Sequence, residues 1–230
     1  MIELFPEGFE EIDRPGGVEL AAYTDAQGEE RLWHIFGAAS GEDVADGWAD
    51  RWRSFHRPVR IGRLWIGPPW ERPDDDLLAV VVDPGRAFGT GAHPTTRLCL
   101  ELLQKLEPRS LLDVGCGSGV LSVAAALLGF APVVAVDTEQ AAVEATEANA
   151  RANGVDLSVR LVEPDSKLPD TSVVVANISF EADSDVTSRV SADELLTSGY
   201  LADRSLAFGG YEHVERLVSD GWAADLHRRA

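Results

Sequence analysis

The stretch LLDVGCGSGVLSVAAALLG, residues 111–129, decides the fold class of this 230-residue chain. It begins with a short apolar run typical of a buried strand, and residues 120–129 form a nearly all-apolar segment of helical length that a glycine closes. The glycines between the two segments let the backbone turn tightly and approach a ligand closely. We therefore predict a strand–loop–helix unit whose helix N-terminus, with its free N–H groups, suits a carboxylate or phosphate.

The spacing of these glycines discriminates between cofactors. A dinucleotide-binding loop needs a third small residue at position 120, where this chain has Val120. The observed GxGxG pattern instead favours S-adenosylmethionine (SAM) over NAD, and a glycine-rich turn without a ligand stays open as the alternative. The candidate cofactor-binding residues of this loop are Asp113, Gly115, Cys116 and Gly117.

An acidic residue, Asp137, ends the next apolar strand, PVVAVD at 132–137. A carboxylate at the tip of the second strand of a nucleotide-binding fold can accept both ribose hydroxyls. We expect Asp137 to bind the ribose, with Thr138 beside it in the cofactor site. Alternatively, either residue could be the N-cap of the helix that begins near residue 139.

The most unusual segment is DPGRAFGTGAHPTT, residues 83–96, between an apolar strand and a helix. A loop at the carboxyl end of a strand lies at the edge of an α/β sheet where ligands bind. We expect Phe88 to cover the cofactor and Thr96 to form a hydrogen bond with it, whereas His93 is expected to be structural, as lone histidines usually are. The candidate cofactor-binding residues of this segment are Phe88, Gly89, Thr90, Gly91 and Thr96.

An asparagine, Asn177, lies near the end of the strand predicted at 171–178. At this edge of the sheet, its side-chain carbonyl could accept a hydrogen bond from an amine nucleophile or help to hold SAM. A strand-ending asparagine in a turn is the open alternative. Asn177 is the candidate catalytic residue.

Strands and helices alternate from residue 77 onward, which predicts an α/β fold with a mostly parallel sheet and helices on both faces. Near the end, Asp220-Gly221 separates two strand-like runs, a strong signal for an antiparallel hairpin. The predicted elements are strands at 77–82, 110–115, 132–137, 157–162, 171–178 and 194–201, with helices at 95–106, 120–129 and 139–154.

The first 76 residues differ from this alternation. Two β-rich runs, 18–25 and 30–36, predict a hairpin. They are followed by a predicted short helix at 44–54 and a strand at 60–67. The chain is thus divided into a reduced N-terminal hairpin segment (1–46), a Trp- and Pro-rich connector (47–76) and a SAM-binding domain (77–230).

Composition argues against several classes of function. With 20 Lys+Arg against 39 Asp+Glu, the net charge of −19 argues against direct nucleic-acid binding and anionic membranes. It favours a basic protein partner or a cationic substrate, and an acidic excess that serves solubility alone is the open alternative. Two cysteines without a CxxC or Cys/His cluster predict neither a disulfide framework nor a metal site. The start, MIELFPEGFEE, lacks a signal-peptide pattern, and no apolar run is long enough for a membrane span, so we expect a cytoplasmic protein.

Five segments within residues 47–178 resemble the class I SAM-dependent methyltransferases and, more narrowly, the ribosomal protein L11 methyltransferase (PrmA) family. They are FHRPVRIGRLWIGPPW, DPGRAFGTGAHPTTRLCLELL, LLDVGCGSGVLSVAAALLG, VDTEQAAVEATEANARANG and VVVANI. The resemblance implies a Rossmann-like sheet of seven strands, five of them parallel, with an antiparallel hairpin at the end. It also implies that the family's SAM contacts correspond to Thr96, Gly115, Asp137 and Asn177.

The resemblance further implies methyl transfer from SAM, leaving S-adenosylhomocysteine, to lysine or N-terminal amines of a protein, most readily ribosomal protein L11. Two segments depart from the family's pattern. The stretch before the connector is short for the family's substrate-recognition domain, and residues 179–193 are acidic where the family has an apolar helix. Two alternatives therefore stay open: a methyltransferase acting on another protein or a small molecule, and a SAM-binding interaction protein without turnover.

Overall fold

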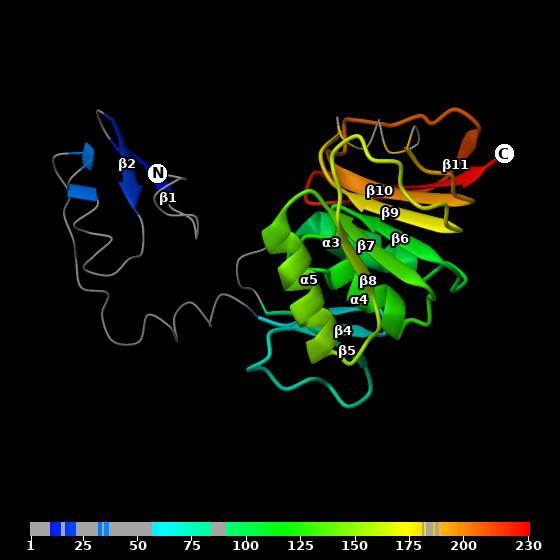
Figure 1. The fold of residues 1–230 in the computed structure, drawn as a ribbon, viewed down its shortest axis with the longest axis horizontal. Helices are drawn as coiled ribbons and strands as arrows, with labels where there is room; N and C mark the ends of the chain where they lie inside the picture. The colour runs from blue at the N-terminus through cyan, green and yellow to red at the C-terminus, as the bar shows by residue number, and fades with distance from the viewer. Residues whose placement is uncertain are drawn as a thin grey trace. The chain divides into compact units, whose positions relative to one another are not determined.

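The structure is a computed structural model, and it describes residues 57–83, 91–180 and 189–230, together with 10–14, 17–21, 32, 33, 35, 36, 182 and 186. The chain forms two compact units, Met1–Trp52 and Arg53–Ala230 (Figure 1). All of the predicted site residues belong to the second unit.

In the first unit, a short hairpin pairs β1 (Glu10–Arg14) with β2 (Gly17–Ala21). The predicted pairing of residues 18–25 with 30–36 is wrong, because the partner of β2 precedes it and residues 32, 33, 35 and 36 are helical. A short apolar run such as 30–36 does not distinguish a strand from a helix by its periodicity. The Pro-Gly dipeptide between β1 and β2 is the turn signal that marks the actual hairpin.

The second unit is built on a seven-stranded sheet with the strand order β11-β12-β10-β9-β6-β7-β8 (Figure 1). Strands β10, β9, β6, β7 and β8 run parallel to one another, whereas β12 and β11 are antiparallel to their neighbours. The predicted mostly parallel sheet is thus confirmed. The parallel strands are β6 (Leu111–Val114), β7 (Val133–Asp137), β8 (Ser158–Leu161), β9 (Val173–Asn177) and β10 (Glu194–Leu201).

The predicted C-terminal hairpin is confirmed as well. It consists of β11 (Tyr211–Ser219) and β12 (Trp222–Arg229), joined by two residues. Asp220 has a φ of 50° and Gly221 a φ of 80°. Positive φ at both central residues is what a tight type I′ hairpin turn requires, and an Asp-Gly pair adopts it readily.

A separate three-stranded sheet precedes the seven-stranded one in the chain, with β3 (Val59–Ile61), β4 (Leu64–Gly67) and β5 (Leu78–Val81). Residues 60–67 are therefore not one strand: the chain turns at Gly62, which has a φ of 55°, so that β3 and β4 pair antiparallel. The strand predicted at 77–82 forms, but it pairs parallel to β4 rather than joining the main sheet. This sheet joins the predicted connector to the start of the predicted SAM-binding domain.

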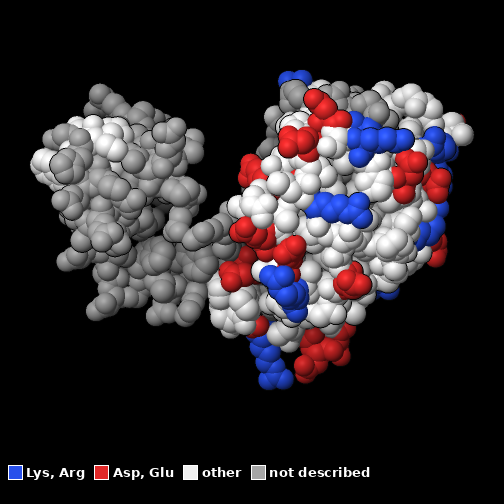
Figure 2. All heavy atoms as spheres, in the orientation of Figure 1, with Lys and Arg blue, Asp and Glu red and all other residues white. Residues whose placement is uncertain are grey.

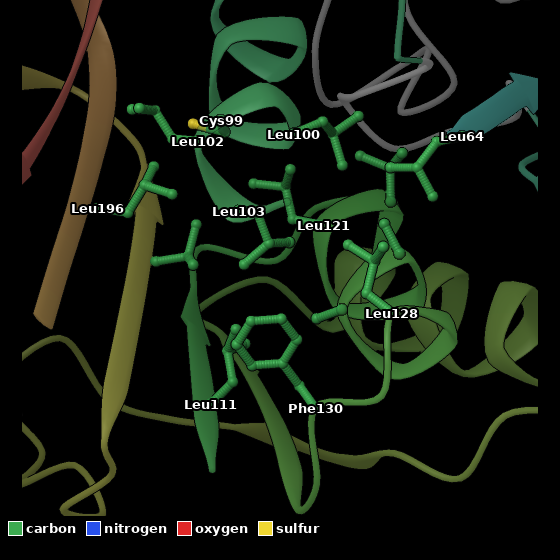
Figure 3. Close-up of a cluster of buried hydrophobic side chains, with 14 of the residues drawn as sticks. Leu64, Cys99, Leu100, Leu102, Leu103, Leu111, Leu121, Leu128, Phe130 and Leu196 are labelled. Carbon is green, nitrogen blue, oxygen red and sulfur yellow. The ribbon is translucent and has the colours of Figure 1, made fainter. Parts of the chain in front are cut away.

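Helices α3 (Pro94–Leu103) and α4 (Val120–Leu127) pack against one face of the main sheet, and α5 (Gln140–Ala152) contacts α4, β7 and β8. Figure 3 shows the apolar cluster at the centre of this packing, to which α3, α4, β4, β6 and β10 all contribute leucines. Each fully buried leucine stabilises the fold by about 1.5–3 kcal/mol, so this cluster anchors the elements that carry the site.

The opposite face of the main sheet has a second apolar cluster. Strand residues such as Leu112, Val134 and Val174 face it, and Val186, Val190 and Phe208 cover it.

The helix predicted at 44–54 lies outside the described residues. In the described part of the chain, no helix is long and apolar enough to cross a membrane, and no group of three or more His, Cys, Asp or Glu could hold a metal ion.

Candidate active site

Asp137, Asn177, Thr96 and the glycine loop lie at the edge of the main sheet where its parallel strands end. β6 is central: the chain leaves it for β7 on one side and later returns to β9 on the other. In open α/β sheets, ligands bind at such a switch point, beyond the carboxyl ends of the strands. β7 ends at Asp137 and β9 at Asn177, so these two residues flank the glycine loop that follows β6.

The backbone of the glycine loop is held close to its neighbours. The N–H groups of Gly115 and Cys116 both donate to the Val136 carbonyl, at 2.9 and 3.1 Å. Gly115 has a φ of 72°, and a Cβ on it would lie 2.3 Å from the Cγ2 of Ile178. Gly119, with a φ of 78°, is the N-cap of α4. The loop therefore offers backbone rather than side chains to a ligand at this edge.

Asp113, in β6, is a deeply buried carboxylate. Its Oδ2 accepts a hydrogen bond from the Ser122 hydroxyl at 2.5 Å, whereas its Oδ1 is buried without a hydrogen-bond partner among the described residues. Burial raises the pKa of Asp113 from 3.8 to about 6, and the Ser122 hydrogen bonds oppose this rise. The group is therefore mostly ionised at neutral pH, with one oxygen able to accept from a further donor.

Asp137 joins two neighbouring segments of the site. Its Oδ2 accepts from the Gly117 N–H and its Oδ1 from the Glu139 N–H, both at 3.0 Å. Glu139, rather than Asp137 or the exposed Thr138, occupies the N-cap position of α5. Each carboxylate oxygen keeps a second lone pair. Asp137, which is only partly buried, can thus accept hydrogen bonds from a ligand while holding both segments.

Asn177 and Thr96 come together although they are 81 residues apart. Asn177 Nδ2 donates to Thr96 Oγ1 at 3.3 Å, and Thr96 is buried in the first turn of α3. The Oδ1 of Asn177 is buried and has no hydrogen-bond partner in the part of the chain that the structure describes. Asn177 therefore combines a fixed carboxamide with an acceptor suited to a donor such as an amine.

The backbone that follows Asn177 passes very close to β10. Ile178 N donates to the Ser198 carbonyl at 3.1 Å, and a Cβ on Gly199 would lie 1.7 Å from the Ile178 carbonyl oxygen. Gly199 has a φ of 109° and lies in a β-bulge. Sequence reasoning missed this residue, although a glycine inside a strand pattern often marks a bulge or a close backbone approach.

Segment 83–96 is described only in part. Phe88, Gly89 and Thr90 lie outside the described residues. Gly91 is described: its φ is 83°, and a Cβ on it would lie 2.5 Å from the Cγ2 of Ile66 in β4. At this position, glycine therefore allows the chain to pass close against β4 before α3 begins.

His93 has the structural role expected of it. It is the N-cap of α3, where its Nδ1 accepts from the Thr95 N–H at 3.4 Å and lies 2.8 Å from the Thr95 hydroxyl oxygen. Its ring also lies edge-on to Trp222, with the centroids 4.9 Å apart. His93 therefore helps to fix the start of the helix that carries Thr96.

Cys116 is the loop residue with a reactive side chain, and its surroundings suppress that reactivity. Burial raises the pKa of the Cys116 thiol to about 12. The Thr146 hydroxyl lies 3.2 Å from its Sγ. Because the thiolate is the nucleophilic form, Cys116 is not a nucleophile at neutral pH.

Helices α4 and α5 supply polar side chains that the sequence reasoning did not single out. Ser122 donates to Asp113, Thr146 Oγ1 donates to the Gly117 carbonyl at 3.0 Å, and Asn149 Nδ2 donates to the Ser118 carbonyl at 2.8 Å. Each is a polar residue on the buried face of an otherwise apolar or alanine-rich helix. A polar residue on the buried face of a helix was the sequence signal that could have identified them, because a buried polar side chain needs a hydrogen-bond partner.

Comparisons with known proteins agree with this geometry. A protein-family model described as ribosomal protein L11 methyltransferase (PrmA) matches residues 21–223. A ribosomal protein L11 methyltransferase of Symbiobacterium thermophilum is 42% identical over 193 residues, covering 79% of this chain and 62% of the relative. One from Shewanella sediminis is 41% identical over 191 residues, covering 80% and 65%. The chain thus spans less than two thirds of the length of these two relatives.

A solved structure shares this fold over nearly all of its own length. The ribosomal protein L11 methylase of Lactobacillus delbrueckii subsp. bulgaricus matches with a TM-score of 0.67 and 27% sequence identity. The match covers 76% of this chain and 99% of that one. The α/β architecture expected from the alternation of strands and helices is therefore that of a class I methyltransferase.

Proposed function

We propose that this chain, which belongs to the ribosomal protein L11 methyltransferase (PrmA) family, transfers a methyl group from SAM to an amine of a protein. Membership follows from the match over residues 21–223 and from the identity to the relatives. The reaction, the cofactor and the acceptor are the proposal, and the contacts at the sheet edge support them.

The observation that carries the proposal is a pair of buried oxygens beside the glycine loop. Asp113 Oδ1 and Asn177 Oδ1 have no hydrogen-bond partner among the described residues. Buried polar atoms are nearly always hydrogen-bonded, so such atoms in a native fold call for an explanation, and a ligand donor is one. SAM carries an ammonium group, an adenine amine and ribose hydroxyls, which suit carboxylate and carboxamide oxygens. The donor set of SAM therefore fits these residues.

Further residues at the same edge would hold SAM. Glycine at position 115 allows the loop to pack closely against Ile178, where a Cβ would clash, and this packing holds the loop at the edge of the sheet. The N-terminus of α4, at Gly119, favours a carboxylate such as that of SAM. The open lone pairs of Asp137 would accept from the ribose hydroxyls.

SAM, when bound, supplies a methyl group that is already activated on a sulfonium. The residues of the chain then have to hold a neutral amine in line with it, which is catalysis by proximity and orientation. A lysine amine has a pKa of about 10.4, and burial near a positive charge would lower it, so no strong base is needed. Asn177 Oδ1 would accept a hydrogen bond from the amine and orient its lone pair. Cys116, whose thiol stays protonated, takes no part as a nucleophile.

The proposed acceptor is a basic protein, with ribosomal protein L11 the first candidate because the relatives are named for it. Residues 1–56 contain 4 Lys+Arg and 13 Asp+Glu, so they contribute 4 − 13 = −9 to the net charge of −19. Figure 2 shows acidic and basic side chains interspersed on the visible face of the second unit. A negative charge excess steers a basic partner toward the enzyme. A ribosomal acceptor would place the reaction in the cytoplasm.

The test combines binding with transfer. We expect calorimetry to show SAM binding that Asp137→Ala weakens at least about tenfold, while the exposed Asp156→Ala, as the control, leaves it unchanged. Radiolabelled methyl groups should appear on purified ribosomal protein L11. Label on a different protein of a cell extract would instead identify another acceptor. SAM binding without any transfer would point to an interaction protein, and an unchanged affinity of Asp137→Ala would contradict the ribose assignment.

A further inference from the structure

Three polar side chains lie along one face of α5 and its C-cap. Thr146, Asn149 and Asn153 are three and four residues apart, a spacing that places side chains above one another on a helix. Thr146 is completely buried and Asn149 is 4% exposed. Burying polar groups costs free energy unless their hydrogen bonds are made, so their partners indicate what these residues are for.

Asn149 links two segments that the sequence associates with the cofactor. Its Nδ2 donates to the Ser118 carbonyl of the glycine loop at 2.8 Å, and its Oδ1 accepts from the Asp83 N–H at 3.1 Å. Asp83 follows β5 closely and is the first residue of the segment 83–96. One carboxamide therefore fixes the distance between the glycine loop and the start of that segment.

Thr146 holds the preceding peptide of the same loop. Its hydroxyl donates to the Gly117 carbonyl at 3.0 Å, and its Cγ2 would lie 2.8 Å from a Cβ on Gly119. Since the peptide bond is planar and trans, a Gly117 carbonyl fixed toward α5 directs the N–H of Ser118 away from α5. The two side chains thus set the orientation of the loop from behind.

Asn153 makes a different set of contacts. Its side chain accepts from the Val81 N–H at 2.8 Å and donates to the Val81 carbonyl at 2.7 Å, and it also donates to the Asn149 carbonyl at 2.7 Å. These hydrogen bonds are with β5 and α5 rather than with the glycine loop. Asn153 is therefore a natural control for the other two residues.

We infer that Thr146 and Asn149 are positioning residues for SAM: they hold the glycine loop in its binding conformation and tie it to Asp83, just beyond β5. A glycine-rich backbone has the largest conformational freedom of any sequence, and this freedom is lost when a ligand is bound. Side chains that fix the loop beforehand reduce that loss and so increase affinity. The inference rests on the proposed function, since SAM is the ligand concerned.

The experiment measures SAM affinity of the full chain by calorimetry, at a temperature where every variant is folded. Thr146→Val keeps the shape of the side chain but removes the donor, and should raise the Kd about tenfold. Asn149→Ala, which loses both hydrogen bonds, should raise it about tenfold or more. Thr146→Ser retains the hydroxyl and should restore wild-type affinity. Asn153→Ala should lower the Tm but leave the Kd within about twofold of wild type.

The outcomes separate the inference from the proposed function. A Kd unchanged in both Thr146→Val and Asn149→Ala overturns the inference, and so does an equal loss in Asn153→Ala. A wild-type chain that does not bind SAM overturns the proposed function instead. Should Asn149→Ala fail to fold, the nearly isosteric pair Thr146→Val and Thr146→Ser decides the matter alone.

Discussion

Replacing Asp113 with asparagine should stabilise the fold at alkaline pH while weakening SAM binding. Asp113 is 1% exposed, and its Oδ1 has no hydrogen-bond partner among the described residues. Such a carboxylate costs the folded state free energy, because burial takes its charge out of water without full compensation. If it is retained for a cationic or N–H donor of the cofactor, stability and binding should change in opposite directions.

The magnitude follows from the pKa of Asp113, which burial raises from 3.8 to about 6. A raised pKa means that the folded state holds the proton more tightly than the unfolded chain does. The stability linked to that proton is complete below a pH of about 4 and is lost as the pH rises through about 6. At 1.36 kcal/mol per pKa unit, the loss amounts to about 3 kcal/mol above that pH.

Asparagine removes this pH-dependent loss because it carries no charge. Its carbonyl can still accept from Ser122, but its NH₂ group then occupies the place of the unpartnered Oδ1, at a cost of about 1–2 kcal/mol. At pH 5, between the two pKa values, about half of the 3 kcal/mol loss is already present and offsets this cost, so the advantage of Asp113→Asn over wild type should be close to zero. At pH 8 it should reach about 1–2 kcal/mol in the free energy of unfolding.

The assay is urea unfolding of both proteins without ligand at pH 5 and pH 8, followed by tryptophan fluorescence. Asp225→Asn is a matched control, because Asp225 is also buried but accepts hydrogen bonds from Tyr200 and His213 and forms an ion pair with Arg216. At pH 8 the control should lose about 1–3 kcal/mol. An Asp113→Asn protein that is less stable than wild type at pH 8, or whose advantage is the same at both pH values, would refute the reasoning.

Two further substitutions and one labelling experiment test other residues at or near the site. Asn177→Ala should lower kcat/KM for methyl transfer at least about tenfold, because an acceptor for the amine is removed; an unchanged rate would exclude Asn177 from catalysis. Gly199→Ala should lower the free energy of unfolding in urea by about 2–3 kcal/mol, because its Cβ would clash with the Ile178 carbonyl oxygen. The control Gly210→Ala, which has open space around it, should lower it by about 1 kcal/mol. Cys116, with its pKa raised to about 12, should resist iodoacetamide at pH 8 in the folded protein and react after denaturation; rapid labelling of the folded protein would contradict this.

The parts of the fold that the sequence predicts well are those set by local rules. The glycine loop after β6 and the Asp220-Gly221 turn require backbone conformations that few residues adopt, so their composition identifies them. The sequence predicts that Asp137 and Asn177 lie near each other because each ends a parallel strand, and parallel strands end at one edge of a sheet. In these cases a short stretch of sequence determines its own geometry.

Apart from the strand predicted at 30–36, where residues 32, 33, 35 and 36 are helical, the errors concern strand partners and turns. Residues 78–81 form the predicted strand, but its apolar sequence fits either sheet, and pairing with β4 is decided by tertiary contacts. Residues 60–67 turn at Gly62, which a run of strand-forming residues concealed. Likewise, Thr146 and Asn149 acquire a role only because α5 packs behind the glycine loop, and periodicity alone does not reveal that.

Unpaired buried groups do not all indicate a ligand, and His227 shows the distinction. Both of its ring nitrogens are buried, and neither makes a hydrogen bond of ordinary geometry with the described residues. The ring packs against Phe208, which belongs to the apolar cluster on the opposite face of the sheet from α3. Burial lowers the pKa of His227, so the ring stays neutral and its burial costs comparatively little. Asp113 does not lose its charge in this way at neutral pH, because its pKa of about 6 leaves it mostly ionised. A persistent buried charge next to a glycine loop needs a compensating donor, and this requirement, rather than the missing hydrogen bond alone, supports the proposed position of the cofactor beside β6.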